Sequence, residues 1–509
     1  MLGQDVLAAL PGVILLAGAL LAGLSRRPAR AVGRSLAAQR TACALTAALA
    51  LIVFFGGRID GVLFALDRLA AVVALLTAGI SLAVQSYARR YMDGDAAIRR
   101  FFRDMGLMAG AILTMVTAAN ALVFAAGWVG SSLALASLVA HRRTWPAARA
   151  AARRTALFLG VGDAALVLAA LVAVAAFGTA DIATMAAEAT ARAGEPAVLA
   201  ISALLVVAAL AKSAQLPLAG WLPETMTAPT PVSGLMHAGF VNAGGYLLAR
   251  FADLFVAQPV LMGALFVIGA ATALAGSLAM LVQSDVKRAL GWSTVGQMGF
   301  MVMQCGLGAF AAAIYHLVAH GIFKATLFLG AGSVVQEVRD LDNAPAARVK
   351  GPLGVLPAVG FGAAALAVVA LPVLVAPATV LSGPGLVLAS FALLASLHAL
   401  VVWTRHPRGL AVALWPGVLA VAVGLLVYLA GTGGMVLLLG ATVPPLPATV
   451  PVVYVAVPLV FAAALILSWT GVPRPFRGLR DRLYVRLLFA GYRPAGGGHD
   501  TFSHRLDAV

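Results

Sequence analysis

Two lysines of this chain lie inside apolar stretches, where an ionisable side chain is costly. Lys212 interrupts VVAALAKSAQLPLAGW and Lys324 interrupts HGIFKATLFLG, in a chain with only four lysines among 35 basic residues. Placing a charge at the centre of a membrane helix costs about 2.5–3.5 kcal/mol on insertion scales. A desolvated ammonium can release its proton, whereas a guanidinium effectively cannot. The two lysines therefore predict a cation path; the alternative is a structural role, satisfied by carbonyls or an acid.

Two histidines precede Lys324 at helical spacing. His316, His320 and Lys324 stand at i, i+4 and i+8, so a helix places them along one face over about 12 Å. Imidazole accepts a proton at one nitrogen and donates one at the other, which favours a relay. A hydrogen-bonded packing pair is the alternative. A metal pair is less favoured, because a cationic lysine opposes the metal and no third ligand is near.

Prolines and glycines predict broken helices beside these residues. Pro217 follows Lys212 by five residues, so the helix carrying Lys212 is expected to break there. His237 lies in PTPVSGLMHAGFVNAGGYLL, a stretch entered through Pro229 and Pro231. Broken helices at membrane depth are tolerated where they line a hydrated cavity.

Acidic partners for the lysines are scarce. Asp163, in LFLGVGDAALVLAAL, is the best-placed carboxylate to balance Lys212, and a surface cap is its alternative role. The C-terminal third is poor in relay groups, with His398 as its one candidate. There, Pro372 and Pro377 break VALPVLVAPATV without any charge.

The composition requires lipid as the solvent for most of the surface. Of 509 residues, 62% are hydrophobic and 11% are charged, whereas a soluble domain has about 25% charged residues. Apolar stretches of about 20 residues, the length that crosses a bilayer, recur about fifteen times. We predict an all-α polytopic membrane protein with about 14–15 transmembrane helices. The expected spans are 6–24, 41–56, 62–84, 105–120, 122–140, 155–177, 197–216, 230–249, 257–282, 289–306, 309–334, 353–378, 381–404, 409–429 and 450–470.

Arginines gather in the connections between alternate spans, within 26–40, 89–103 and 142–154. Short basic connections stay in the cytoplasm, so we predict a multi-pass protein of the cell inner (plasma) membrane with its N-terminus outside. The membrane domain is expected over 1–472, followed by a basic cytoplasmic tail over 473–509. The net charge of +16 does not indicate nucleic acid, because no aromatic-studded basic groove accompanies it.

Three ordered segments resemble the proton-translocating antiporter-like subunits of complex I and of Mrp antiporters. They are KSAQLPLAGWLPETMTAPTPVSGLMHAG, SDVKRALGWSTVGQMGF and IYHLVAHGIFKATLFLGAGSV, within about residues 60 to 340. The resemblance implies two inverted repeats, each with a broken helix, and a central row of Lys, His and Glu that carries protons. The matching motif positions are Lys212, His237, His316, His320, Lys324 and Asp163.

Within this superfamily, GFVNAGGYLLAR, STVGQMGFMVMQCGLGAF and LYVRLLFAGY look most like the DabB membrane subunits of inorganic-carbon-accumulating complexes. That likeness implies a soluble DabA-like partner related to zinc β-carbonic anhydrases. Cation flow, of H⁺ or Na⁺, would drive the partner's hydration of CO₂ to bicarbonate. The chain itself is then a transport subunit in lipid rather than an enzyme, and we predict no cofactor and no metal site in it.

The chain departs from the family pattern at two places. Complex I subunits carry a key glutamate in a GWEG-like segment, which here reads GWVG, with Val129. Their second broken helix bears a lysine or glutamate, whereas the stretch around Pro372 and Pro377 bears none. The leading hypothesis is an ion-coupled subunit for inorganic carbon transport. A complex I or Mrp-type antiporter subunit, and a membrane anchor that has lost conduction, remain the alternatives.

Overall fold

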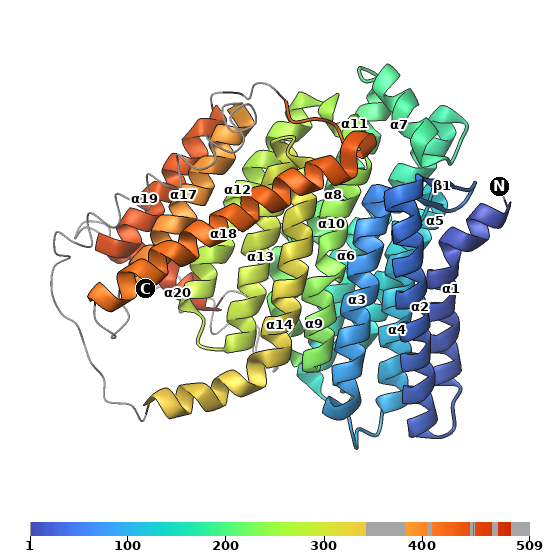
Figure 1. Ribbon diagram of the computed structural model, residues 1–509, viewed down its shortest axis with the longest axis horizontal. Helices are drawn as coiled ribbons and strands as arrows, with labels where there is room; N and C mark the ends of the chain where they lie inside the picture. Colours follow the sequence, from blue (N-terminus) through green and yellow to red (C-terminus); the bar gives the residue numbers. More distant parts are fainter. Residues whose placement is uncertain are drawn as a thin grey trace, which may run out of the picture.

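The structure, a computed structural model, describes residues 2–342, 383–404, 410–447, 451, 453–470 and 477–489. In these residues nearly every segment is helical, and the named strands are one short antiparallel pair, β1 (Ile59–Asp60) with β2 (Ala65–Leu66). Figure 1 shows long helices packed side by side in a bundle. The predicted all-α fold is confirmed.

The first part of the bundle consists of long helices, several with recognisable start signals. Asp67 and Asn120 cap α3 and α5 by accepting backbone N–H bonds, and α2 and α6 begin with proline, which suits the first helical turn. These helices are α1 (Leu2–Gly23), α2 (Pro28–Gly56), α3 (Arg68–Tyr91), α4 (Ile98–Val116), α5 (Ala121–Val139) and α6 (Pro146–Phe177).

The middle of the chain contains shorter, interrupted elements followed by long helices. They are α7 (Ile182–Ala191), α8 (Pro196–Lys212), η1 (Leu218–Thr227), α9 (Thr230–Ala238), η2 (Phe240–Asn242), α10 (Ala243–Arg250), α11 (Ala252–Val256), α12 (Pro259–Val282), α13 (Val286–Gly306) and α14 (Phe310–Asp342). The remaining elements are α17 (Gly383–Thr404), α18 (Leu410–Leu439), η3 (Gly440–Thr442), α19 (Val453–Thr470) and α20 (Arg477–Phe489).

Eight helices in the described part are long and apolar enough to cross a membrane. Every predicted span except 353–378 coincides with at least one helix. That span lies outside the described residues, together with Pro372 and Pro377. The polytopic membrane character is confirmed, and the number of 14–15 spans stays a prediction.

Several helices extend beyond the predicted spans. Helix α2 begins at Pro28 rather than at 41, α4 begins at Ile98 rather than at 105, and α18 ends at Leu439 rather than at 429. For α2 and α4 the predicted starts are wrong because hydropathy marks only apolar residues, whereas these helices begin in basic, polar stretches. For α18 the predicted end is wrong because the apolar run itself continues to Leu439.

The three arginine-rich connections lie at one end of the bundle, opposite the short helix α7 (Figure 1). Arg99 at the start of α4 donates to the backbone oxygen of Ser25 between α1 and α2, at 3.0 Å. Arg100 donates to the backbone oxygen of His141, which lies between α5 and α6. This common end agrees with the charge pattern, and its assignment to the cytoplasm stays a prediction.

Helix α18 runs obliquely across the bundle instead of parallel to α13 and α14 (Figure 1). Tyr315 of α14 donates to the backbone oxygen of Val427 at 3.1 Å. Near the other end of α18, Arg68 of α3 donates to the backbone oxygen of Leu438 at 3.3 Å. The helix therefore ties the later part of the chain to the start of α3.

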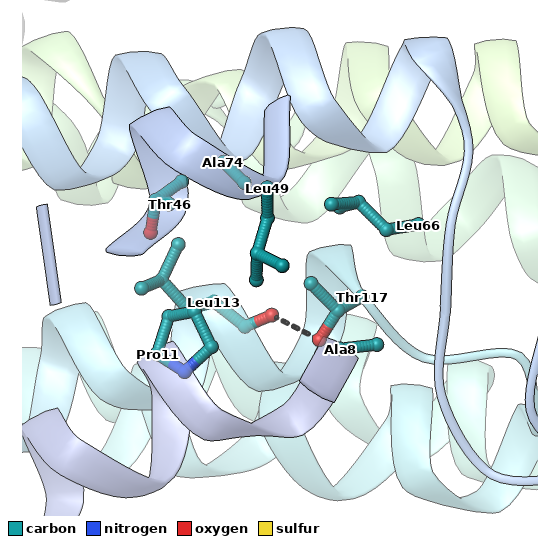
Figure 2. A pocket seen from close by; sticks show the side chains of 8 residues that line it. All are labelled: Ala8, Pro11, Thr46, Leu49, Leu66, Ala74, Leu113 and Thr117. Carbon is teal, nitrogen blue, oxygen red and sulfur yellow. Dashed lines mark hydrogen bonds between the residues drawn. The ribbon is translucent and has the colours of Figure 1, made fainter. Parts of the chain in front are cut away.

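A small cavity between α1, α2, α3 and α4 is a packing gap. Its volume is about 10 Å³ and its lining is apolar apart from Thr46 and Thr117 (Figure 2). Thr46 donates to the Ala42 carbonyl and Thr117 to the Leu113 carbonyl, each within its own helix. About one water fills such a space at most, and no polar group is left over to bind a ligand.

Helices α12 and α13 pack at backbone distance through glycines. A Cβ atom at Gly276 of α12 would meet the backbone of Gly296, and one at Gly299 would meet the backbone of Ala273. Small residues at such spacing allow the close approach that favours helix pairing in membranes.

We expect Gly276→Leu to lower the free energy of unfolding by about 1–3 kcal/mol, because the side chain forces the two backbones apart. Thermal unfolding in lipid nanodiscs measures the change. Gly160→Leu on α6 is the matched control, since a Cβ atom there meets nothing within 4 Å. Equal stability of the two variants would contradict the packing described.

Candidate functional site

The Lys212 side chain is buried at the end of α8 with every donor satisfied. Its Nζ donates to the Trp128 carbonyl oxygen at 2.8 Å, to Ser131 Oγ at 3.0 Å and to Ser132 Oγ at 2.7 Å. An ammonium has three donors, and α5 supplies an acceptor for each. The residue is 1% exposed, so the charge is held by these contacts rather than by bulk water.

Two aromatic rings complete the surroundings of the ammonium. Nζ lies 4.5 Å from the Trp128 ring centroid and 4.3 Å from the Phe240 ring centroid. Aromatic faces within about 6 Å attract a cation, most strongly when it is desolvated. Phe240 belongs to η2, three residues after His237. This contact therefore joins Lys212 to the interrupted stretch α9–η2–α10, which carries His237.

Asp163 of α6 supplies the nearest carboxylate. Its Oδ1 lies 3.9 Å from Lys212 Nζ and accepts a hydrogen bond from Ser132 Oγ at 2.9 Å. Ser132 therefore accepts from the ammonium on one side and donates to the carboxylate on the other. This geometry agrees with the predicted pairing of Asp163 with Lys212, and Asp163 lies within α6 rather than at a helix end. The part that the pair plays in a relay stays a prediction.

The helix that carries Lys212 breaks as predicted, five residues before Pro217. Helix α8 ends at Lys212, Ala214 takes a positive φ of 49°, and the chain resumes as the 3₁₀ helix η1. Trp221 of η1 donates from Nε1 to the Ala211 carbonyl at 3.1 Å. Ser213 donates to the Val241 carbonyl at 2.7 Å. The first bond ties η1 to the end of α8, and the second ties the break to η2.

His237 lies in the last turn of α9, where a second helix is interrupted. Helix α9 begins right after Pro229, with Pro231 in its first turn, and ends at Ala238 before η2 and α10 continue. The imidazole is fully buried and stacks on Phe328 of α14, with centroids 4.4 Å apart. Neither ring nitrogen has a hydrogen-bond partner in the described part of the chain.

His316, His320 and Lys324 lie along α14 as the spacing predicts. The rings of His316 and His320 are 6.0 Å apart between centroids, too far for a direct hydrogen bond, so the packing-pair alternative is not supported. Lys324 is 1% exposed and donates to the Leu290 carbonyl of α13 at 3.3 Å. Among the described residues no ion pair to Lys324 is found, in contrast to Lys212.

Several buried polar atoms near these residues have no protein partner in the described part of the chain. They belong to the segments that carry the relay residues or contact them: Gln215 Oε1, Ser233 Oγ, His237 Nδ1 and Nε2, Asn242 Oδ1, Trp292 Nε1, Gln304 Oε1 and His320 Nε2. Most buried polar groups in proteins are paired. Buried polar groups without a protein partner, such as those of His237 and His320, are candidates for contact with ordered water.

Sequence reasoning missed the α5 residues and one acid. Trp128, Ser131 and Ser132 form the acceptor set for Lys212, and their i, i+3, i+4 spacing places them on one helix face. Asp104 of α4 is 3% exposed and accepts from Ser137 of α5 at 2.7 Å. This spacing acquires a meaning only once Lys212 is placed beside it. Asp104 was hidden because it follows Arg103 in an arginine cluster.

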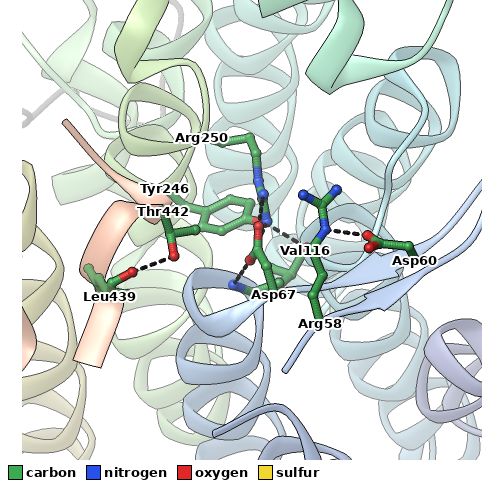
Figure 3. A network of polar contacts seen from close by, with 9 residues as sticks. Arg58, Asp60, Asp67, Val116, Tyr246, Arg250, Leu439 and Thr442 are labelled. Carbon is green, nitrogen blue, oxygen red and sulfur yellow. Dashed lines mark hydrogen bonds and ion pairs between the residues drawn. The ribbon is translucent and has the colours of Figure 1, made fainter. Parts of the chain in front are cut away.

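A second buried ion pair fixes the far end of the broken helix (Figure 3). Arg250, the last residue of α10, pairs with Asp67, the cap of α3. Arg250 also donates to Tyr246 Oη at 2.8 Å, and Tyr246 donates to the Val116 carbonyl at 2.6 Å. The network holds α10 against α3 and α4, which limits where the interrupted segment before it can move.

Comparison with known families gives two matches. Residues 118–404 match the family described as NADH:quinone oxidoreductase/Mrp antiporter, transmembrane. Residues 61–102 match the family described as the N-terminus of NADH-ubiquinone oxidoreductase (complex I) chain 5. The first match covers more than half of the chain and includes all six candidate relay residues.

Individual relatives agree with this match. A probable inorganic carbon transporter subunit DabB1 of Halothiobacillus neapolitanus is 41% identical over 66% of this chain and 63% of its own length. NADH-quinone oxidoreductase subunit L of Mycobacterium tuberculosis is 37% identical over 60% of this chain and 49% of its length. The chain thus spans about half to under two thirds of the length of these relatives.

A solved structure agrees as well. The Mrp complex from Dietzia sp. DQ12-45-1b aligns with a TM-score of 0.58 at 25% identity, over 98% of this chain and 54% of that one. The alignment extends to nearly the whole chain, so the likeness is not confined to the motif region.

We expect Asp163→Asn to destabilise the protein and Lys212→Met to offset part of that loss, because removing one partner leaves the other charge buried without compensation. The coupling free energy between the two changes should be about 1–3 kcal/mol, measured by thermal unfolding of the single and double variants in nanodiscs. The exposed pair Glu188–Arg192, changed in the same way, is the control and should couple by less than about 1 kcal/mol. Strict additivity at Asp163 and Lys212 would show that the pair does not interact.

Proposed function

The chain belongs to the family of transmembrane subunits of NADH:quinone oxidoreductases and Mrp antiporters, and we propose that it is the proton-conducting membrane subunit of an inorganic carbon transporter. The observation that carries the proposal is the Lys212 ammonium, buried and linked through a hydroxyl to a carboxylate. The likeness to three inorganic carbon transporter subunits, from Halothiobacillus neapolitanus and Hydrogenovibrio crunogenus, supports the assignment to carbon transport.

The hydroxyl of Ser132 is oriented for proton transfer. Lys212 donates to Ser132 Oγ, and Ser132 donates to Asp163 Oδ1. If each proton moves one position along this chain, the ammonium becomes an amine and the carboxylate becomes a carboxylic acid. The net charge of the site stays the same, so the step avoids the cost of creating an uncompensated charge in a low-dielectric interior. The site can thus receive or release a proton from either end.

On α14 the proton carriers form a second row. His320 Nε2 and both ring nitrogens of His237 have no protein partner in the described residues, and water bridging such atoms would extend a hydrogen-bonded path. His237 of α9 lies against α14 through Phe328. We propose that protons pass between the Lys212 site and Lys324 through this segment.

The chemistry of these residues favours H⁺ over Na⁺. Hard cations such as Na⁺ are bound by oxygen ligands, and carboxylates are their strongest protein ligands. The candidate row consists of two lysines and three histidines with one carboxylate. Ammonium groups repel a bare cation, whereas they carry a proton as part of their own structure.

Carbon chemistry is assigned to a partner. We propose that a soluble DabA-like protein, related to zinc carbonic anhydrases, docks on this subunit and hydrates CO₂, and that proton flow makes bicarbonate accumulation unidirectional. A second candidate function is an antiporter-like subunit of a respiratory or Mrp complex, favoured by the 37% identity to subunit L.

Lys212→Met and Lys324→Met should each reduce bicarbonate uptake by cells by about 100-fold, because each removes a proton carrier. Lys324→Arg should fail as well, since a guanidinium effectively does not release its proton. Lys287→Arg is the matched control, because Lys287 donates to the Ala228 carbonyl outside the proposed row. Normal uptake by correctly assembled Lys212 and Lys324 variants would rule out conduction through them.

Uptake of inorganic carbon should collapse on adding a protonophore and survive exchange of Na⁺ for K⁺. The measurement is accumulation of labelled bicarbonate in cells that express this chain with its genomic neighbour. Accumulation that follows the Na⁺ gradient would contradict proton coupling. Loss of NADH oxidation or of Na⁺ extrusion in a deletion strain, with carbon uptake unchanged, would support the antiporter-like alternative instead.

A further inference from the structure

An open basin lies at the arginine-rich end of the bundle, away from the relay residues. It has a volume of about 570 Å³ and lies between the α3–α4 and α5–α6 connections. Its polar and aromatic lining comprises Asp95, Arg100, His141, Arg142, Arg143 and Trp145. Three guanidinium groups thus face one carboxylate around a space of small-molecule size, for which about 300–1,000 Å³ is usual.

The carboxylate in this basin is already engaged. Asp95 accepts from the Ala97 backbone N–H at 2.7 Å and pairs with His141 Nε2 at 3.2 Å. Burial acts to raise the pKa of Asp95, but these two bonds, together with the electrostatic attraction of His141 and Arg142, outweigh it and lower that pKa. Asp95 also attracts Arg100 and Arg142, and with three guanidinium groups against one carboxylate the lining keeps an excess of positive charge.

The arginines have donors to spare. Arg100 donates from one terminal nitrogen to the His141 carbonyl, and its buried Nε has no partner among the described residues. Arg142 and Arg143 are exposed on the rim, and neither makes an ion pair within the described part of the chain. Guanidinium groups bind phosphate in a bidentate manner.

The surroundings indicate a lipid rather than a free ion. Trp145 is 45% exposed at the rim, and Tyr87 and Tyr91 are 36% and 46% exposed on the last turns of α3, which leads into the same connection. Partly exposed Trp and Tyr at helix ends are typical of the headgroup level of a bilayer. Basic pockets between transmembrane helices at that level bind anionic headgroups. The volume also exceeds what inorganic phosphate needs.

We propose that this basin binds the headgroup of an anionic phospholipid, with its phosphate held by Arg100, Arg142 and Arg143 and its glycerol against Trp145. The site bridges the two connections, so a bound lipid links the start of α4 to the start of α6, the helix that carries Asp163. The inference rests on the basin alone and does not depend on carbon transport.

The test uses the full-length chain, in whatever complex it purifies, with short-chain lipids as probes. Dioctanoyl phosphatidylglycerol, dioctanoyl phosphatidylcholine and inorganic phosphate are titrated while the unfolding temperature is followed, and native mass spectrometry counts bound lipid. The variant is Arg142→Gln/Arg143→Gln. The control, Arg89→Gln/Arg149→Gln, removes the same charge from exposed positions outside the basin.

We expect phosphatidylglycerol to raise the unfolding temperature of the unmodified chain and of the control. The concentration for half of that effect should rise about tenfold in the basin variant, because two charge-assisted contacts are lost. Arg142→Lys/Arg143→Lys, which keeps the charge but not the bidentate geometry, should fall between them. An unchanged response in the basin variant, or an equal response to phosphatidylcholine, overturns the proposal. Inorganic phosphate acting at the same concentration as phosphatidylglycerol would show a free-anion site instead.

Discussion

The burial of the Lys212 ammonium is the constraint on which the surrounding architecture depends. A cation inside an apolar bundle must find partners for all its donors, because no bulk water reaches it. Helix α5 meets this need with one carbonyl and two hydroxyls on a single face. Helix α8 ends at that point, and α6 brings the balancing carboxylate. Three helices are thereby fixed relative to one another by one side chain.

The two buried lysines are held by different sets of contacts. Lys212 has three strong acceptors and a nearby carboxylate, whereas Lys324 donates to one carbonyl at 3.3 Å within the described structure. Within the described structure the Lys212 ammonium therefore has more hydrogen-bond acceptors than the Lys324 ammonium, and it has a carboxylate nearby. The network of Asp67, Arg250 and Tyr246 holds the segment between them in position.

The sequence predicted the residues that are unusual in apolar helices, namely charged residues and prolines. It did not predict residues that are common in such helices. Lys212, Asp163 and the break before Pro217 were predictable because charge and proline are costly in hydrocarbon. Ser131 and Ser132 were not, since serine in a membrane helix is inexpensive and signals nothing until its partner is known. The oblique course of α18 was equally hidden, because an apolar helix has the same composition whichever way it runs.

Val129 stands where the GWEG-like segment of complex I subunits has an acid, and the geometry around Lys212 shows that this difference does not leave the lysine without a carboxylate partner. The neighbouring Trp128 contributes its backbone carbonyl and its ring to Lys212, and Val129 lies elsewhere on the helix, partly exposed. The carboxylate that balances the ammonium comes from α6 and reaches it through Ser132. An acid at position 129 is therefore not required to give Lys212 a carboxylate partner. The arrangement around Lys212 therefore does not support the alternative that the chain is a membrane anchor that has lost conduction.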